Sequence, residues 1–439
     1  MTLVEDEVEG LFATLYLERA MQEMLLIKGV LQPLRTLAHQ RLLEIGFPGI
    51  QKEAFGSFAF KNFHEQKFAV SSFPSVLDEE WIQSAVAPEC QGRCLVFVNG
   101  RFRRELSLLE KMDGNISLLS LEEAMKTFGH FLQKRLTQQI KEETDPFALL
   151  NTVLHPEGFF IYVPPKMIVD APFQILHLLT REKGFITPRL HVCVGAGAHF
   201  KLYTSIQELD GSHNAVVGMI DIALEDRAEC IHFATASTLA QSSSIEILRA
   251  SVKKGGSLKT GRISQGDVKH LSDIEVSLLG EGSSFHVSAL GVLSGNGIME
   301  SKIVAHHKAP HTVSMQKFKG VLRDYSRSSF EGKIIVDRIA QKTNAYQLSN
   351  YLLLGEFARA LSKPNLEISA DDVKASHGST VAKLQDDLLF YLKSRGLNSS
   401  QAKTLLVEGF CGEIIASCFL ESLRLKLAQS VENRCQTLP

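Results

Sequence analysis

The chain has 439 residues, of which 44% are apolar and 22% charged, enough for a large core and for two or three domains. Its 47 basic and 49 acidic side chains leave a net charge of -2, so no overall field directs it to nucleic acid or to an anionic membrane. The sequence therefore predicts neither as a partner.

The N-terminus and the cysteines bear on location. The acidic start MTLVEDEVEG is unlike the basic start of a secretory signal, and no apolar run is long enough to span a bilayer. Seven cysteines, an odd number scattered over the chain, do not suggest a disulfide framework. We therefore expect a cytoplasmic protein.

Residues 1–145 are predicted to form a mixed, mostly helical region. Apolar residues recur at helical spacing from Val8 to about Ile45. A short alternating strand is predicted at 95–98, and Ser120 with Glu123 forms a capping box ahead of a further helix.

Residues 146–345 are predicted to form one long all-β block. Ile274, Val276 and Leu278 alternate with polar residues before GEGSS, and Ile334 and Val336 alternate after EG. Two sandwiches would need a linker between them, whereas the stacked turns of a solenoid need none, because each turn buries its apolar face on the next. The pattern favours a mainly β solenoid core.

Residues 346–439 are predicted to form a C-terminal helical domain that includes a last β segment at 366–377. The run ALSKPN at 360–365 is interpreted as the end of one helix, and a second helix ends at Gly396. A final helical stretch from about Ser400 carries an apolar stripe. This stripe either docks on the protein itself or binds a partner.

Two groups of residues suggest chemistry, each with a simpler alternative. The cluster HHKAPH contains His306, His307 and His311, which either supply imidazoles to iron or zinc or simply face water. The pairs Cys90 with Cys94 and Cys411 with Cys418 lack the spacing of a zinc knuckle and are interpreted as buried thiols.

A third group lies near the end of the β block. Asp371, Asp372 and His377 resemble a general acid–base set, as in solenoid enzymes that cleave polysaccharides. The alternative is that the two acids are turn residues at strand ends. Considered without the rest of the chain, the position of His377 suits three alternatives: a metal ligand, a general base or a turn residue.

No nucleotide-binding loop is present, since no G-x-x-x-x-G-K-[ST] sequence occurs. The glycine-rich runs VGAGAH and KKGGSLKTG lack the lysine and hydroxyl at the required positions. The chain is therefore not expected to hydrolyse ATP by itself.

Several runs together resemble the SufB/SufD family of iron-sulfur cluster assembly proteins. They are GFFIYVP, PRLHVCVGAGA, HHKAPHTVSMQKFKGVLRDYSRSSFEGKIIV and LEISADDVKASHGSTVAKLQDDLLFYLKSRG, in that order from about Asp145 onwards. The resemblance implies a right-handed parallel β-helix core flanked by an N-terminal mixed or helical region and a C-terminal helical domain. These three parts agree with the three regions predicted from the residues alone.

The family has two branches, and the residues resemble the SufD type. YQLSNYLLLG places Ser349 where SufB-type proteins carry a cysteine, and SHGST stands in place of their EHEATTS. The resemblance implies a non-enzymatic scaffold that pairs with a SufB-like subunit and binds a SufC-like ABC ATPase. When isolated, the chain is instead expected to pair with a second copy of itself. An iron-sulfur cluster or iron is expected to be bound transiently and shared with the partner, with none held tightly by the isolated chain. A SufB-like cluster-carrying scaffold and a solenoid carbohydrate-active enzyme are the alternatives.

The resemblance also implies site residues. His377 matches the histidine that SufD-type proteins place at the SufB interface, where iron or a nascent cluster binds, and imidazole suits iron. Ala375 stands where SufD proteins often have cysteine, so no thiolate is expected there. The segment 383–392 matches the region before the ATPase-binding helices. Within and just after it we expect the partner-binding residues Lys383, Asp386, Asp387, Tyr391 and Arg395.

Overall fold

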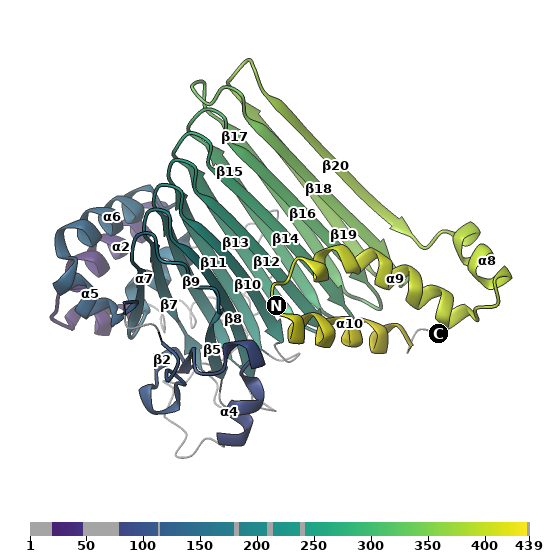
Figure 1. The fold of residues 1–439 in the computed structure, drawn as a ribbon, viewed down its shortest axis with the longest axis horizontal. Helices are drawn as coiled ribbons and strands as arrows, with labels where there is room; N and C mark the ends of the chain where they lie inside the picture. The colour runs from purple at the N-terminus through teal and green to yellow at the C-terminus, as the bar shows by residue number, and fades with distance from the viewer. Residues whose placement is uncertain are drawn as a thin grey trace, which may run out of the picture.

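The computed structural model describes residues 20–46, 79–112, 115–179, 184–208, 214–237 and 242–436. Its body is a coil of stacked turns whose strands form two long sheets (Figure 1). From β8 onwards, successive strands enter the two sheets alternately, and neighbours within a sheet are parallel. The chain is thus a mainly β parallel solenoid, which confirms the fold class predicted from the sequence.

Each sheet has ten strands within the described residues. Sheet I contains, in spatial order, β2 (Arg101–Phe102), β1 (Cys94–Val98), β5 (Phe173–Leu179), β8 (His199–Glu208), β10 (Glu229–Ser237), β12 (Ser257–Gly266), β14 (Ser284–Leu293), β16 (Val313–Leu322), β18 (Asn344–Leu353) and β20 (Lys374–Lys383). Sheet II contains β19 (Arg359–Ile368), β17 (Arg327–Val336), β15 (Ile298–His307), β13 (Lys269–Leu278), β11 (Ser243–Val252), β9 (Ala215–Leu224), β7 (Arg189–Val194), β4 (Gly158–Val163) and β3 (Ser117–Ser120), and β6 (Phe185–Ile186) pairs with β9.

The core lies between the two sheets. Ile274, Val276 and Leu278 of β13 point inward together with Phe285 and Val287 of β14, and all five are buried in one cluster. Burying a Val, Leu, Ile or Phe side chain contributes roughly 1.5–3 kcal/mol each. Because a strand has a side-chain period of two, the alternation seen in the sequence marks this inner face directly.

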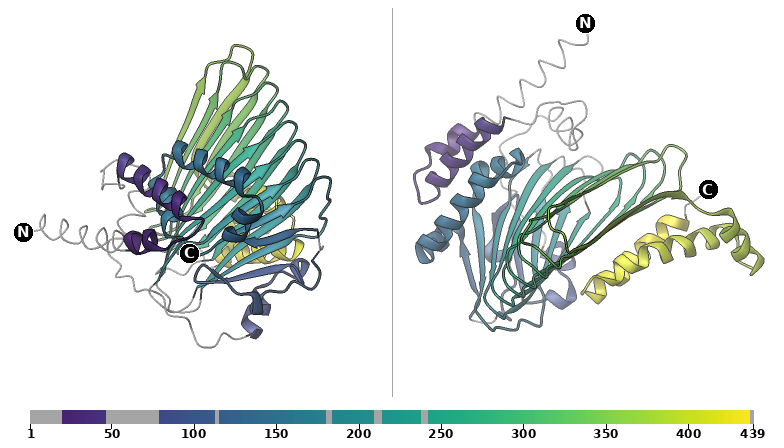
Figure 2. Two further views of the ribbon diagram at one scale, coloured as in Figure 1. Left: turned by 90° about the vertical axis from the view of Figure 1, so that its left-hand side faces the viewer. Right: turned by 90° about the horizontal axis from the view of Figure 1, so that it is seen from above.

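Helices cover the outer faces of both sheets (Figure 2). The first group comprises α2 (Gln32–Ile45), α5 (Leu121–Thr127), α6 (Gly129–Glu142) and α7 (Pro146–Leu154). It packs against the early strands of sheet II, where Leu149 and Val153 share a buried cluster with Val217 and Ile247. The predicted capping box of Ser120 is present at the start of α5. The predicted helical residues before residue 20 lie outside the described part of the chain.

The second group of helices lies near the opposite end of the chain. It comprises α8 (Asp386–Ser394), α9 (Ser399–Ala416) and α10 (Glu421–Gln436). Helices α9 and α10 lie along sheet I, where Val407 and Ile414 share a cluster with Phe233 and Ile263. A short helix, α4 (Glu79–Ala85), and two 3-10 turns, η1 (Pro88–Cys90) and η2 (Arg104–Leu106), flank the first strands. Helix α8 projects away from the body beside β20 (Figure 1).

The strands extend beyond the region in which the sequence predicted them. Residue 345 was the predicted end of the β core, but β18, β19 and β20 continue it to Lys383. The run 360–365, interpreted as the end of a helix, belongs to β19 and pairs in register with β17. Strands β19 and β20 form the last turn of the solenoid and bury less of their surface than the strands before them, so their apolar alternation is weak.

The unbroken run of strands also begins later than predicted, although β1, β2 and β3 of the two sheets come earlier in the chain. Residues 146–154 form helix α7, which Asp145 caps by accepting a hydrogen bond from the backbone N–H of Ala148 at 2.8 Å. All of its side chains from Phe147 to Leu154 are buried. A helix buried on every side lacks an amphipathic period, which is why the sequence pattern there indicated a strand.

The turns of the solenoid stack closely, and Gly280 lies at one tight contact. A Cβ at this position would overlap the backbone nitrogen of Lys254 in the preceding turn. We expect Gly280→Ala to lower the free energy of unfolding by about 1–3 kcal/mol, since rigid backbone must move. Gly412→Ala is the control, because no atom lies within 4 Å of an added Cβ in helix α9, and a gain of roughly 0.5–1 kcal/mol is expected there. Urea unfolding of both variants measures this; equal stabilities would contradict close stacking.

Candidate functional site

The last turn of the solenoid is an open end. Strand β20 pairs with β18 and strand β19 with β17, and no described strand pairs with their other edges. Most side chains on β19 and β20 are exposed or half-buried. Two ten-residue strands therefore present free backbone N–H and C=O groups to a partner.

His377 lies in the middle of β20 on this open end. It is paired in register with Gln347 of β18 and is exposed. Its neighbour Ala375, two residues earlier on the same face, packs against an inner cluster with Ala345 and Ile334. His377 therefore belongs to the inner face of sheet I and reaches solvent at the open end. At Ala375 the chain offers a methyl group and no thiol.

Asp371 and Asp372 form the turn between β19 and β20. The backbone N–H of Asp372 donates to Gln341 Oε1 at 2.9 Å, and the carboxylate of Asp372 pairs with Lys342. The backbone N–H of Lys342 donates to the carbonyl of Asp372 at 2.7 Å. These contacts tie two neighbouring turns together, in agreement with the interpretation of the acids as turn residues.

The histidines of HHKAPH are engaged separately. The two ring nitrogens of His307 bond to the hydroxyls of Thr312 at 2.7 Å and Ser314 at 2.8 Å, and burial lowers its pKa to about 4. His306 Nε2 lies 2.8 Å from Asp337, and His311 has a positive φ in a turn. Within the described residues no group of three or more His, Cys, Asp or Glu side chains is placed to hold a metal. The geometry gives the metal hypothesis for these histidines no support.

The cysteines with described side chains are all buried, and none of them forms a disulfide within the described residues. Burial raises the pKa of Cys90 to about 12 and that of Cys418 to about 11. Such thiols stay protonated and are poor nucleophiles and ligands. The interpretation of both cysteine pairs as buried thiols is confirmed.

Helix α8 carries the expected partner-binding residues. It has no buried residue, and Leu388, Phe390 and Tyr391 are exposed, Phe390 by 74%. The guanidinium of Arg395 lies over the ring of Tyr391 at 5.2 Å. Lys383 ends β20, and Asp386 and Asp387 lie in the first turn of the helix. Acidic side chains at this end of a helix interact favourably with its dipole. The helix thus presents an apolar surface with charged residues at both ends.

The apolar stripe of the last helical stretch has a different role from that of α8. Of the residues predicted for this stripe, Ile414, Leu420 and Leu427 are buried in a cluster with residues of sheet I, and Phe410 and Leu423 pack against the same cluster partly buried. Of the two predicted alternatives for this stripe, docking on the protein itself is the one observed.

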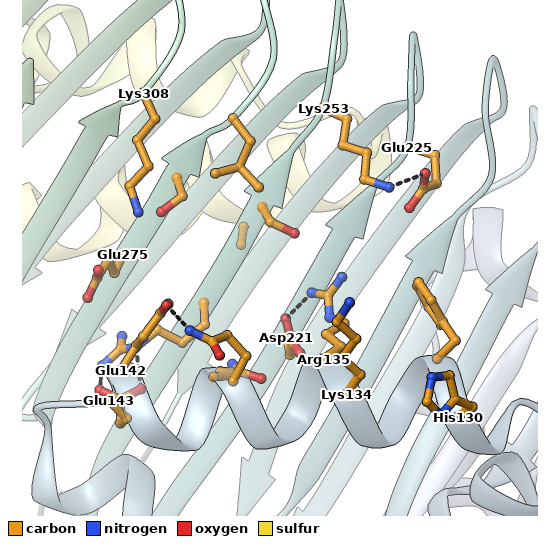
Figure 3. Close-up of a pocket in the computed structure, with 18 residues that line it drawn as sticks. His130, Lys134, Arg135, Glu142, Glu143, Asp221, Glu225, Lys253, Glu275 and Lys308 are labelled. Atoms are coloured by element: carbon orange, nitrogen blue, oxygen red, sulfur yellow. Dashed lines mark hydrogen bonds and ion pairs between the residues drawn. The ribbon is translucent and has the colours of Figure 1, made fainter. Parts of the chain in front are cut away.

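A groove that the sequence did not suggest lies between α6 and sheet II (Figure 3). Its volume is about 820 Å³. Arg135 of α6 points to the sheet and pairs with Asp221 at 2.7 Å, and His191 Nδ1 lies 3.3 Å from the same carboxylate. Burial opposes ionisation of Asp221, but Arg135 and His191 outweigh it and hold its pKa far below the ordinary value.

A second buried ion network closes one end of this groove. Arg249 of β11 donates to both oxygens of Glu143 at 2.9 and 3.0 Å and to Asp273 at 2.8 Å. Lys302 adds a contact to Asp273 at 3.3 Å. The buried charges are therefore mutually neutralised, and they hold the α6–α7 corner on sheet II. Glu143 lies 106 residues before Arg249, and Asp273 lies 24 residues after it, so no local motif marks the network.

No described helix is long and apolar enough to cross a membrane. The fold and the site define a class of protein: a parallel β-solenoid with an open last turn, a histidine at its mouth and a projecting apolar helix.

Comparison with known proteins places the chain in one family. Residues 177–410 match the family description "SUF system FeS cluster assembly, SufBD core domain", and residues 7–175 match "SufBD protein N-terminal region". The core-domain match alone covers more than half of the chain. The chain therefore belongs to the SufBD family of iron-sulfur cluster assembly proteins.

Curated relatives cover most of the chain. The iron-sulfur cluster assembly protein SufD of Escherichia coli (strain K12) is 25% identical over 412 residues, which is 90% of this chain and 91% of that protein. SufD of Bacillus subtilis (strain 168) is 23% identical over 418 residues, 92% and 94% of the two chains. An iron-sulfur cluster assembly SufBD family protein of Synechocystis is 28% identical over 377 residues, 82% of each.

Proposed function

We propose that the chain is a SufD-like scaffold subunit, without catalytic activity of its own, of a cytoplasmic complex that builds iron-sulfur clusters. Its open end would pair with a SufB-like subunit, and with a second copy of itself when it is isolated. The observation that carries the proposal is the open last turn, where two edge strands and His377 lie together. Similarity to proteins named SufD over nine-tenths of the chain supports it.

The edge strands suit pairing with another solenoid. A partner strand can continue each sheet by backbone hydrogen bonds, as in β-strand addition. Lys363, Pro364 and Lys374 lie on β19 and β20, and such residues on an edge discourage unspecific pairing. His377 would then lie at the junction, where its imidazole could bind iron or a nascent cluster shared with the partner. The iron-sulfur cluster is cargo here, held transiently.

Co-purification tests the assembly. The tagged chain, co-expressed with a SufB-like and a SufC-like protein, is expected to retain both through gel filtration. A chain that retains neither would contradict the scaffold assignment.

We place the ATPase contact on helix α8. Changing Phe390 to Asp replaces the most exposed large apolar side chain of this helix by a charge, and loss of one aromatic anchor that a partner buries typically costs 2 kcal/mol or more, roughly 30-fold in affinity. Since no residue of α8 is buried, the fold should be unchanged. Pull-down of the SufC-like ATPase measures the effect. Lys393→Asp, on the same helix, is the control and should change binding much less; equal loss in both would place the contact elsewhere.

A further inference from the structure

A column of inner-face residues runs along sheet I and ends at His377. Register places these residues beside one another on successive strands: His232, Thr260, Val287, Gln316, Gln347 and His377. Paired parallel strands lie about 4.8 Å apart. Gln347 is therefore the inner neighbour of His377 on the only described strand that pairs with β20.

Gln347 is buried yet has no hydrogen-bond partner. Only 3% of its surface is exposed, and within the described protein neither its Oε1 nor its Nε2 has a partner. The same holds for Gln316 Oε1, one turn deeper, and for Ser362 Oγ of β19. Buried polar atoms of this kind destabilise the fold when they stay unsatisfied.

Gly332 of β17 makes room for this amide. A Cβ there would overlap Gln347 Nε2 and lie 2.5 Å from its Cδ, so the side chain of Gln347 extends across the interior to sheet II. Ser362 is paired in register with Phe330, two residues before Gly332 on the same face. The polar atoms of both sheets thus face one space just behind the open end.

We propose that Gln347, Gln316 and Ser362 line a hydrated chamber behind the open end, and that Gln347 acts through bound water as a positioning residue for His377. Clustered buried polar atoms are normally satisfied by internal water. An amide that both donates and accepts can order such water on either side. Water held by Gln347 fixes the proton of one ring nitrogen of His377 and leaves the other nitrogen free toward the open end.

This inference rests on the proposed function, because it gives His377 the orientation that an iron ligand needs. Groups that hydrogen-bond a ligating histidine set its tautomer and ring direction. The prediction concerns the protein before any iron binds, so it can be tested on the isolated full-length chain.

The experiment is NMR of the ¹⁵N-labelled chain. The ring signals of His377 are assigned by their loss in His377→Ala, and the side-chain amide of Gln347 by its loss in Gln347→Leu. In the wild type we expect magnetisation transfer from long-lived water to the Gln347 amide and one dominant tautomer of His377. Gln347→Leu should move the tautomer ratio by roughly 2- to 10-fold, the equivalent of one net hydrogen bond.

Gly332→Ala gives a second route, since it displaces the amide without removing it, and it should reproduce the change. Tyr346→Leu alters the adjacent, outward residue of β18 and should leave the ring signals as they are. Absence of water transfer to the Gln347 amide in the wild type would overturn the proposal even if both variants failed to fold. An unchanged tautomer ratio in a folded Gln347→Leu would overturn it too. Failure of His377→Ala to affect cluster formation would instead remove the proposed iron role and leave the chamber standing.

Discussion

Arg249→Ala is expected to lower the free energy of unfolding by about 3–5 kcal/mol, because it leaves buried carboxylates without their counter-charge. Glu143 and Asp273 both lie within hydrogen-bond distance of Arg249, and all three are almost fully buried. The ion pair of Arg249 with Glu143 also joins the N-terminal helices to sheet II, so removing Arg249 should loosen that junction first. Hydrogen exchange should therefore rise in α6 and α7 before the rest of the chain.

Lys253→Ala is the matched control. Lys253 follows the same strand and pairs with Glu225 at 2.7 Å, but both side chains are substantially exposed. Such a surface pair contributes about 0–1 kcal/mol. Chemical denaturation of the two variants beside the wild type measures the difference. Equal losses would show that burial of the Arg249 network does not matter.

The same network gives the wild type a pH dependence. Burial opposes ionisation of Asp273, but Arg249 and Lys302 outweigh it and hold its pKa below the ordinary 3.8. The contribution of ionised Asp273 to the free energy of unfolding is then complete above its ordinary pKa of 3.8. It is lost as the pH falls through the lowered pKa. Asp145, whose pKa burial and the charge of Asp273 raise to about 7, is already protonated in the folded state below pH 4. In Arg249→Ala the pKa of Asp273 should be less depressed, so the variant should lose less stability than the wild type as the pH falls.

The second large effect is expected at His377. In a complex with a SufB-like and a SufC-like protein, His377→Ala should reduce the iron and sulfide retained by roughly 10-fold or more, the range found when a group that supports a metal site is removed. Folding of the chain should be unchanged, because His377 is exposed, and the complex should still assemble, because the proposed partner contacts are backbone pairing at β19 and β20 and the surface of helix α8. Ser379→Ala, two residues further on the same strand face, is the control. Full retention of iron in His377→Ala would remove the site.

Local patterns in the sequence were sufficient for the centre of the solenoid. Ile274, Val276 and Leu278 alternate because one face of β13 is buried and the other is not, and a period of two records that difference. At the two ends of the β core the rule fails for opposite reasons. Helix α7 is buried on all sides, and β19 is buried on few, so neither shows the period of its own structure.

The site was only partly accessible from the sequence. His377 was singled out by its resemblance to a family motif, and the structure adds that it lies on the inner face at an open end. Its neighbour Gln347 lies thirty residues earlier in the sequence, and only the strand register shows that the two residues are adjacent. Arg249, Glu143 and Asp273 likewise meet across three elements. Contacts made by stacking of distant turns leave no local spacing in the sequence.

A SufD-like subunit should support a cluster in the complex without carrying one alone. Anaerobic reconstitution with iron and sulfide tests it directly, when the isolated chain and its complex with the SufB-like and SufC-like proteins are compared by visible absorption after gel filtration. We predict cluster absorption in the complex and none on the isolated chain. A stable cluster on the isolated chain would contradict this assignment and favour a SufB-like carrier.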